Sequence, residues 1–418
     1  MKYFIIRMLP ALFAGSIFFH QSADGQQAWT IYNDVNSPLP QNTIRCIAVD
    51  AQNRKWVGTD FGLAMYNDTV WTNYNAINTG GGLTDNGIRT FAFDPAGNLW
   101  IGTFNGGACR FDGTNWTSLR VNNSGIPDDF VKAIAFDTSG HMWFGTPSGL
   151  AKYDGTTWEV WDNNNSPLLS NHITSIAIGS NNMKYLGTLN GGMVYFDGDT
   201  TWEFYNHVNG LLPDNTVLSV ALDSSGFRWA AMPAQGIIVH YGGLIFQWYN
   251  ITNSLIPSSA VVHIMVDSLQ TIYCSSQNEG FIVFNGTTFV NYKTTNSPMP
   301  DDYVLCTAKD QNGILWVGTY NGGLVRVDES ILASVNGVQE TSTVNLYPNP
   351  TKDILYLAGI KPEGKSFAIS DITGKIRFQK NISSTNTTQD VSFLPPGIYF
   401  LRIFSPDGVI TKKFVKTN

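Results

Sequence analysis

The sequence predicts an all-β protein in which a seven-bladed β-propeller is followed by a small immunoglobulin-like β-sandwich. Two observations carry this prediction: aromatic residues recur at a regular interval, and short strand patterns alternate with turn residues. The composition agrees, because the 418 residues include 12 Trp and 40 Gly but only 14% charged residues. Such a composition favours strands and turns over helices.

The recurring aromatic residues define the repeat. Two positions each return seven times, at spacings of 41 to 46 residues, and intervals of this length are typical of repeat architectures. The first position holds Trp29, Trp71, Trp116, Trp158, Trp202, Trp248 and Phe289, and the second holds Trp56, Trp100, Trp143, Tyr185, Trp229, Tyr273 and Trp316.

Each repeat contains four expected strands. In the second repeat they are Ile88 to Phe93, Leu99 to Thr103, Ala108 to Phe111 and Asn115 to Leu119. Turn residues separate them, such as the Asp112-Gly113 pair that favours a tight hairpin. Four antiparallel strands in a repeat of this length are typical of one propeller blade.

The two ends of the repeat region predict closure of the ring. The last repeat supplies three strands, Val304 to Lys309, Leu315 to Thr319 and Leu324 to Val327, and lacks a fourth. Trp29 to Tyr32 is an unpaired closing strand at the other end. We expect it to complete the last blade, because closure removes the open edge of the ring. Residues 26–330 therefore predict seven blades.

The strand order assigns the loops to the two ends of the ring. Loops after the second and fourth strands share one end, here called the connector face. The loops after the fourth strands, here called connectors, are long and rich in Asn, Ser and Pro, as in Asp34 to Gln41 and Asn164 to Ser170. Functional residues are concentrated on long loops over a rigid scaffold. We therefore expect a ligand to bind at the connector face.

Residues 1–25 have the composition of a secretory signal peptide. Lys2 and Arg7 precede an apolar run from Met8 to Phe19, and the small residues Ala23 and Gly25 suit cleavage. The run is too short to cross a bilayer as a helix, and we expect no transmembrane segment. The sequence therefore predicts an exported protein.

The charge is unevenly distributed along the chain. Residues 26–336 carry a net charge of −12, whereas residues 337–418 carry +4. A surface this acidic repels phosphate groups, so nucleic acid is not an expected partner.

The repeats share a motif in which I-x-x-I-A-x-D is followed by W-x-G-T, G-G-L and Y-D-G segments. This motif resembles the repeats of the two-component regulator propeller family. In that family such propellers form the extracellular sensing part of membrane-spanning kinases, but no kinase or DNA-binding region is expected here. The matching segments are Asn42 to Tyr66, Asn86 to Phe111, Phe130 to Tyr153, Asn171 to Phe196 and Tyr303 to Val327.

After a linker at residues 331–343, residues 344–418 form the expected sandwich. Strands are predicted at 344–347, 354–357, 367–370, 376–379, 391–393, 398–403 and 410–415.

Four segments of this region resemble the type A sorting domain of the type IX secretion system: Leu346 to Pro350, Ile369 to Lys375, Leu394 to Tyr399 and Lys412 to Lys416. The resemblance implies export by the type IX machinery, removal of the domain by a sortase-like peptidase, and release or attachment at the surface of a Gram-negative bacterium. The sorting residues it implies are Pro348, Asn349, Pro350, Gly374, Gly397, Tyr399, Lys412 and Lys413.

The four cysteines, Cys46, Cys109, Cys274 and Cys306, are expected to be free and buried. Cys46 and Cys306 occupy equivalent positions in neighbouring blades, where equivalent side chains face the next blade rather than each other. Packed sheets lie about 10 Å apart, and a disulfide needs Cα atoms within about 7 Å. His263 shares this first-strand position, which is otherwise small, so a core or channel histidine is favoured over a catalytic base.

Carboxylates precede several of the expected first strands. They could converge on the channel mouth and hold a cation such as Ca²⁺ or bind sugar hydroxyls. Pro-Asp and Asp-Asn pairs are also common turn formers, which is the alternative explanation. The residues are Asp85, Asp128, Asp129, Asp214, Asp301 and Asp302.

The main functional hypothesis is a secreted or surface propeller that binds a glycan or peptide without catalysis. No catalytic signature such as H-E-x-x-H or G-x-S-x-G occurs, and no cofactor is expected. The alternatives are a polysaccharide lyase or glycosidase that uses channel-mouth carboxylates, and a structural surface component. The predicted ligand-binding residues are Phe61, Asn105, Asp129, Asn190, Asp302, Tyr320 and Asn321.

Overall fold

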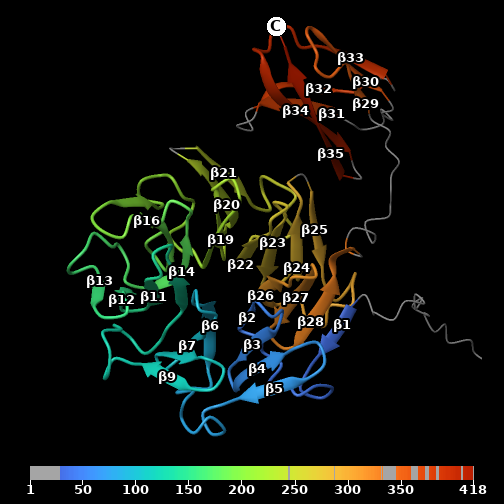
Figure 1. Ribbon diagram of the computed structural model, residues 1–418. Helices are drawn as coiled ribbons and strands as arrows, with labels where there is room; N and C mark the ends of the chain where they lie inside the picture. The colour runs from blue at the N-terminus through green and yellow to red at the C-terminus, as the bar shows by residue number, and fades with distance from the viewer. Residues whose placement is uncertain are drawn as a thin grey trace, which may run out of the picture.

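A computed structural model describes residues 29–330 except 243–244 and 287, residue 332, and residues 345–417 except 359–365, 372–375, 383–385 and 406–407. The predicted signal peptide and all of the predicted linker except residue 332 lie outside this description. Seven four-stranded antiparallel sheets are arranged around a centre (Figure 1), which confirms the predicted propeller.

The blades are numbered along the chain. Blade one is β2 (Cys46–Val49), β3 (Lys55–Thr59), β4 (Gly62–Tyr66) and β5 (Trp71–Tyr74), and blade two is β6 (Ile88–Phe93), β7 (Leu99–Thr103), β8 (Ala108–Phe111) and β9 (Trp116–Leu119). Blade three is β10 (Ala133–Phe136), β11 (Met142–Thr146), β12 (Gly149–Tyr153) and β13 (Trp158–Trp161), and blade four is β14 (Ile173–Ile178), β15 (Lys184–Thr188), β16 (Met193–Phe196) and β17 (Trp202–Tyr205). Blade five is β18 (Ser219–Leu222), β19 (Arg228–Met232), β20 (Gly236–Gly242) and β21 (Ile245–Tyr249), and blade six is β22 (Val261–Val266), β23 (Ile272–Ser276), β24 (Phe281–Phe284) and β25 (Phe289–Tyr292).

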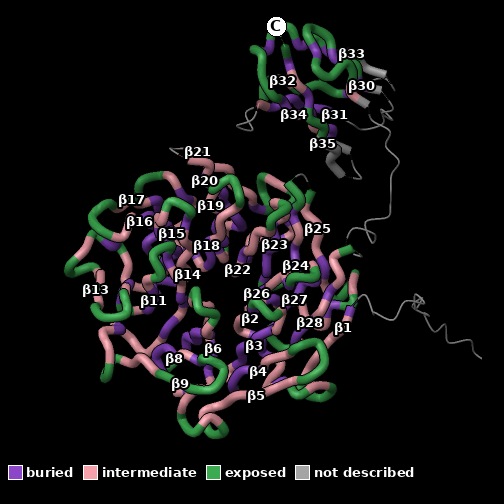
Figure 2. Tube along the Cα trace, in the orientation of Figure 1, coloured by how far each residue is buried: buried purple, intermediate pink, exposed green. Residues whose placement is uncertain are grey.

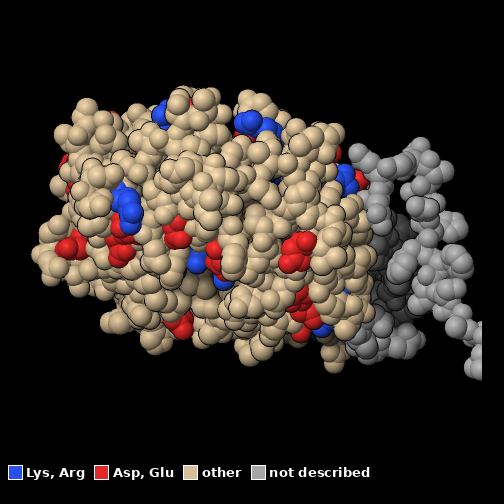
Figure 3. Space-filling view, turned by 90° about the horizontal axis from the view of Figure 1, so that it is seen from below, with Lys and Arg blue, Asp and Glu red and all other residues tan. Residues whose placement is uncertain are grey.

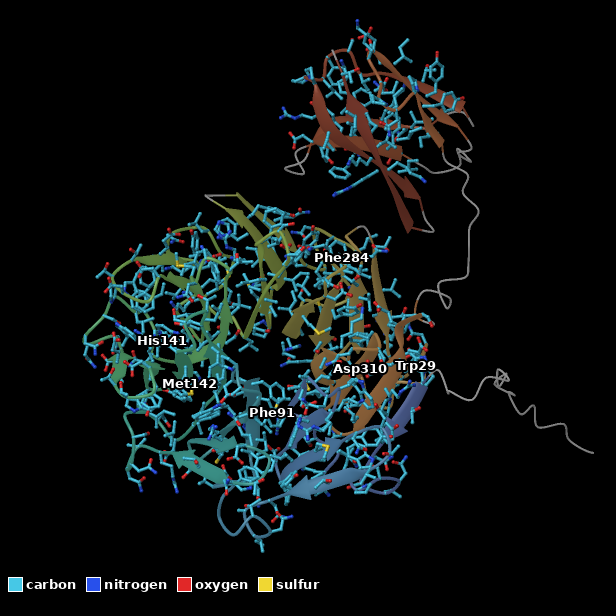
Figure 4. The ribbon with its side chains drawn as sticks, in the orientation of Figure 1. Trp29, Phe91, His141, Met142, Phe284 and Asp310 are labelled. Carbon is cyan, nitrogen blue, oxygen red and sulfur yellow. The ribbon has the colours of Figure 1, made fainter. Side chains whose placement is uncertain are left out.

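Blade seven closes the ring with strands from both ends of the propeller. Its strands are β26 (Val304–Lys309), β27 (Ile314–Thr319), β28 (Leu324–Asp328) and β1 (Trp29–Tyr32). Strand β1 pairs antiparallel with β28, so that Trp29 lies opposite Val327 and Tyr32 opposite Leu324. The predicted closing strand is therefore confirmed, and β2 of blade one contacts β26 of blade seven. Figure 4 labels Trp29 and Asp310 in this blade, and Phe91 beside the centre of the ring.

The core lies between neighbouring blades, where the inner strands are buried (Figure 2). Trp56, for example, is 2% exposed and packs against Phe111 of blade two. The Gly of the W-x-G-T motif permits this close packing. A Cβ atom at Gly58 would lie 2.6 Å from the Ile88 Cγ2 atom of blade two, which is far inside contact distance.

The C-terminal region forms two facing sheets. One is β29 (Asn345–Tyr347), β30 (Ile354–Ala358) and β33 (Asn386–Asp390), and the other is β32 (Ile376–Asn381), β31 (Ser366–Asp371), β34 (Gly397–Ser405) and β35 (Gly408–Lys416). Buried side chains from both sheets, such as Leu355 and Phe414, form one core.

One predicted strand of this region is wrong. Residues 391–393 are not a strand, and the strand β33 lies just before them at Asn386–Asp390. The apolar Val391 suggested a strand, but this residue begins a turn and its side chain is buried there. Leu394 N donates a hydrogen bond to Val391 O (3.0 Å) and closes the turn. The true strand is polar because it has a single pairing partner, β30, and lies at a sheet edge.

Candidate functional site

The connectors are held in shape by a recurring asparagine. Asn36 Oδ1 accepts a hydrogen bond from Asn33 N (2.8 Å), and Asn36 Nδ2 donates to Ile31 O (3.0 Å). This residue was not among the predicted ones, although its sequence signal is an Asn seven positions after the first recurring aromatic. Both bonds are repeated at Asn78, Asn123, Asn165, Asn209 and Asn296.

Two of the predicted ligand-binding carboxylates hold connectors in place. Asp129 Oδ1 accepts from Val121 N (2.9 Å), and Asp302 Oδ1 accepts from Thr294 N (2.7 Å). An amide serves equally well in other blades, because the same bond to the connector is made by Asn42, Asn86, Asn171 and Asn215. A ligand role for Asp129 and Asp302 stays a prediction.

The neighbouring carboxylates cap turns. Asp85 Oδ1 accepts from Gly87 N (3.2 Å) and Oδ2 from Asn105 N (2.7 Å), and Asp301 bonds Tyr303 N and Asn321 N in the same way. The first bond of each carboxylate is that of a turn former, and the second joins it to the hairpin after the second strand of the same blade. Within the described ranges, no three His, Cys, Asp or Glu side chains are grouped as a metal site requires. Ca²⁺ binding therefore stays a prediction without a defined site.

The aromatic candidates lie exposed on the connector face. Phe61, Phe104 and Tyr320 are 63%, 42% and 38% exposed and lie on the hairpins after the second strands of blades one, two and seven. The ring of Tyr320 stacks on Tyr303 with 5.0 Å between centroids, and Phe104 contacts Phe130 edge-on at 4.8 Å.

The amide candidates accompany these rings. Asn105 and Asn321 are exposed on the hairpins of blades two and seven, beside Phe104 and Tyr320. Asn190 is also exposed, but it lies on blade four, farther around the ring. The structure thus brings together the candidates of blades seven, one and two.

A group of charged side chains that the sequence did not predict lies beneath these rings. Asp60 Oδ2 accepts from Arg45 Nη2 (2.6 Å), and Asp60 Oδ1 accepts from Arg89 Nη1 (2.7 Å). The Arg89 guanidinium lies 4.8 Å from the centroid of the Phe104 ring, a cation–π contact. Burial alone would raise the pKa of Asp60, but the hydrogen bonds and charges of the two arginines lower it below its ordinary value.

Lys132 continues this group in blade three. Its Nζ atom lies 3.3 Å from His172 Nε2 and 5.7 Å from the centroid of the Phe130 ring. No ion pair within 4.0 Å joins Lys132 to a carboxylate among the described residues. Burial and the positive charge of Arg89 both lower the pKa of Lys132. Burial and the charge of Lys132 likewise lower the pKa of His172, against a weaker opposing effect of Asp128.

The prediction of free cysteines is confirmed, and three of the four are buried as expected. All four cysteines are free, with Cys109, Cys274 and Cys306 buried and Cys46 partly buried. His263 occupies the first-strand position of Cys46 and pairs with Ser275 of the adjacent strand. Its Nδ1 atom is buried and has no hydrogen-bond partner among the described residues, and burial lowers its pKa to about 4.

In the C-terminal region, Asn349 joins the first segment to the last strand. Asn349 Nδ2 donates to Lys413 O (3.1 Å), and Val415 N donates to Asn349 Oδ1 (2.9 Å). Tyr399 OH donates to Pro395 O (2.9 Å). Gly374 lies outside the described residues. The remaining sorting candidates lie on the surface of the sandwich, and they are Pro348, Pro350, Gly397, Lys412 and Lys413.

The surface carries few charges. In the view of Figure 3, acidic and basic side chains lie in small separate groups rather than in one large patch. In the part of the chain that the structure describes, no helix has the length and hydrophobicity needed to cross a bilayer.

Two family models match parts of the chain. The secretion system C-terminal sorting domain matches residues 345–417, and the two component regulator propeller matches residues 82–105, 125–148 and 298–321. No curated protein sequence matches the chain.

Solved structures share the fold at low sequence identity. The extracellular domain of the hybrid two component system BT3049 from B. thetaiotaomicron has a TM-score of 0.66 at 20% identity, over 94% of this chain and 58% of that one. PorZ, an essential bacterial surface component of the type-IX secretion system of Porphyromonas gingivalis, has a TM-score of 0.58 at 19% identity, over 91% and 60%. Virginiamycin B lyase from Staphylococcus aureus has a TM-score of 0.56 at 12% identity, over 71% and 98%.

This chain therefore spans about three fifths of the length of the BT3049 extracellular domain and of PorZ. The sorting domain indicates secretion to the cell surface or the extracellular space. The chain thus carries two-component regulator propeller repeats together with a type IX secretion C-terminal sorting domain.

Proposed function

We propose that the propeller is a non-catalytic binding module that recognises a glycan or peptide outside the cell. The observation that carries this proposal is the group of exposed rings at the hairpins of blades seven, one and two, namely Phe61, Phe104 and Tyr320. Exposed aromatic faces next to amides such as Asn105 and Asn321 suit stacking and hydrogen bonding to a ligand. Asn190 extends the same face into blade four.

The first proposed partner is the export machinery, which would recognise the sorting domain. A sortase-like peptidase would remove this domain and leave the propeller as the working protein. Mass spectrometry of the protein recovered outside the cell tests this step. We expect a species that ends before residue 345, and recovery of the intact C-terminus would contradict the proposed removal.

Binding is tested with glycan arrays and peptide pull-downs on the full chain. We expect hits that disappear in the double variant Tyr320→Ala/Asn321→Ala. Leu269→Ala is the matched control, because Leu269 is 76% exposed in a turn at the opposite end of the ring. Hits that survive the double variant but vanish with Leu269→Ala would move the site away from the connector face.

A further inference from the structure

One position of the innermost strands separates blades one to three from the rest. This position immediately precedes the first-strand position of Cys46 and its equivalents, and it is basic in three consecutive blades. The innermost strands surround the centre of the ring, so these three side chains gather on one side of the channel mouth. In blade order from one to seven the residues are Arg45, Arg89, Lys132, Thr174, Leu218, Val262 and Leu305.

The charges of this group are incompletely balanced. Asp60 is shared by Arg45 and Arg89, whereas Lys132 contacts His172 and the face of Phe130 and forms no ion pair with a carboxylate among the described residues. The rim carboxylates Asp85 and Asp128 also lie nearby, but their oxygens accept hydrogen bonds from backbone amides and from Ser148. A partly buried cation beside a like charge is unfavourable for folding. Because Lys132 lies at a mouth that faces solvent, we infer that a bound ligand supplies the negative charge that balances it.

We propose that this side of the mouth binds the anionic group of an acidic oligosaccharide, a uronate carboxylate or a sulfate ester, between Arg89 and Lys132. The sugar rings then pack on Phe104 and Phe130. The guanidinium of Arg89 offers a planar pair of donors and the ammonium of Lys132 a point charge, and both suit carboxylate and sulfate oxygens. This proposal rests on the proposed function and specifies its ligand class.

The backbone at the mouth favours a sugar over an acidic peptide. Phe104 N donates to Gly87 O (2.7 Å), and Tyr320 N donates to Tyr303 O (2.9 Å). These hairpins therefore present side chains and no free strand edge, which is what an extended peptide needs for main-chain pairing. Recognition at the mouth depends on charge and ring stacking.

Isothermal titration of the full chain tests the ligand class. The probes are a galacturonate hexamer, a chondroitin sulfate hexasaccharide, neutral cellohexaose and hexaglutamate. We expect at least one acidic saccharide to bind tenfold or more tightly than cellohexaose, with an affinity that falls as salt is added. Equal affinity for acidic and neutral saccharides would overturn the proposal. Equal affinity for hexaglutamate would overturn its sugar component.

The variant Lys132→Met tests the site. We expect the affinity for the acidic saccharide to fall at least tenfold, and Lys132→Arg to retain it. Lys152→Met is the control in the same blade, because Lys152 pairs with Glu159 (2.9 Å) on the outer strands. It is expected to leave the affinity unchanged.

Thermal unfolding separates a binding role from a structural one. Because Lys132 has no carboxylate partner within 4.0 Å in the described chain, we expect Lys132→Met to unfold at the same temperature as the native protein or a higher one. A lowered Tm together with lost binding would assign Lys132 to structure and overturn the proposal. If a neutral saccharide binds through Tyr320 and its affinity is unchanged in Lys132→Met, this inference is refuted but the proposed function is not. If none of the saccharides or peptides binds, the proposed function itself fails.

Discussion

Two regions of the propeller differ in how strictly they keep the repeat: the turns after the first strands, and the inner position at the mouth of the ring. At the end formed by the turns after first and third strands, an Asp side chain accepts from the indole Nε1 of a Trp six residues later in five blades, at 2.9 to 3.2 Å. The pairs are Asp50–Trp56, Asp94–Trp100, Asp137–Trp143, Asp223–Trp229 and Asp310–Trp316. At the connector face, by contrast, the inner position changes from Arg or Lys to Leu or Val around the ring.

This contrast distinguishes structural side chains from candidates for function. A hydrogen bond that recurs with the same geometry in most blades serves the fold, whatever its chemical character. Asp129 and Asp302 belong to this class, because asparagines make the same bond in four other blades. A charged side chain that breaks the repeat and has no carboxylate partner within 4.0 Å among the described residues, such as Lys132, belongs to the other class.

The largest expected effect comes from breaking a recurring bond. In Asp137→Ala, Trp143 Nε1 and the backbone amides of Ser139 and His141 lose their common acceptor. Leaving the buried indole donor of Trp143 unpaired, together with these part-buried amides, costs about 3 kcal/mol of folding free energy. Denaturant unfolding measures this loss. Asp112→Ala is the control, because Asp112 accepts hydrogen bonds from the exposed turn residues Thr114 and Asn115. An equal loss in both variants would remove the distinction.

The next effect tests a break of the repeat inside the ring. His263 has a pKa of about 4 in the folded state and about 6.5 when unfolded. The folded state therefore binds fewer protons in this window, so stability is full above pH 6.5 and declines as the pH falls to about 4. The loss is at most about 3 kcal/mol. We expect His263→Leu to flatten this acid slope in unfolding curves.

The control for this prediction is His207→Gln, because His207 is exposed on a connector. It is expected to leave the acid slope as it is. A slope that persists unchanged in His263→Leu would mean that other groups cause it.

A smaller effect tests the close contact between blades. In Gly318→Ala the new Cβ atom would lie 2.6 Å from Cys306 Sγ and 2.7 Å from Ile44 Cγ2. Overpacking of this kind costs about 2 kcal/mol. Blade five already has Ala231 at the equivalent position, so Ala231→Gly is expected to cost less, about 1 kcal/mol. Calorimetric Tm values compare the two. A larger loss of Tm in Ala231→Gly than in Gly318→Ala would contradict this expectation and would show that the Ala231 side chain contributes more to packing than the close contact at Gly318 does.

Most of the fold could be predicted because the same strand pattern occurs in seven repeats. The spacing of the aromatic residues located the blades, and the unpaired strand Trp29–Tyr32 located the closure. In the sandwich, which has no repeat, apolarity alone placed a strand at residues 391–393 instead of Asn386–Asp390. The prediction was wrong there because an apolar side chain that is buried from a turn, such as Val391, looks the same in the sequence as one that is buried from a strand.

The candidate site was predicted less well for a related reason. The exposed hairpin residues Phe61 and Tyr320 follow from the motif, since their position within each blade is fixed. Arg45 and Lys132 could be found only by comparing one register position across blades. The shared carboxylate Asp60 is a three-dimensional contact that no local pattern contains.

The smallest expected effect falls on Asp302 and decides between binding and catalysis. Asp302→Asn keeps the Oδ1 acceptor for Thr294 N, as Asn42 and Asn171 do in their own blades. We therefore expect a stability change below about 0.5 kcal/mol. A glycosidase or lyase would behave differently, because an amide cannot transfer a proton as a carboxylate does. If the native chain cleaves a polysaccharide and Asp302→Asn does not, this carboxylate is catalytic despite its recurring bond. Recurrence of a contact would then no longer identify a purely structural residue at the connector face.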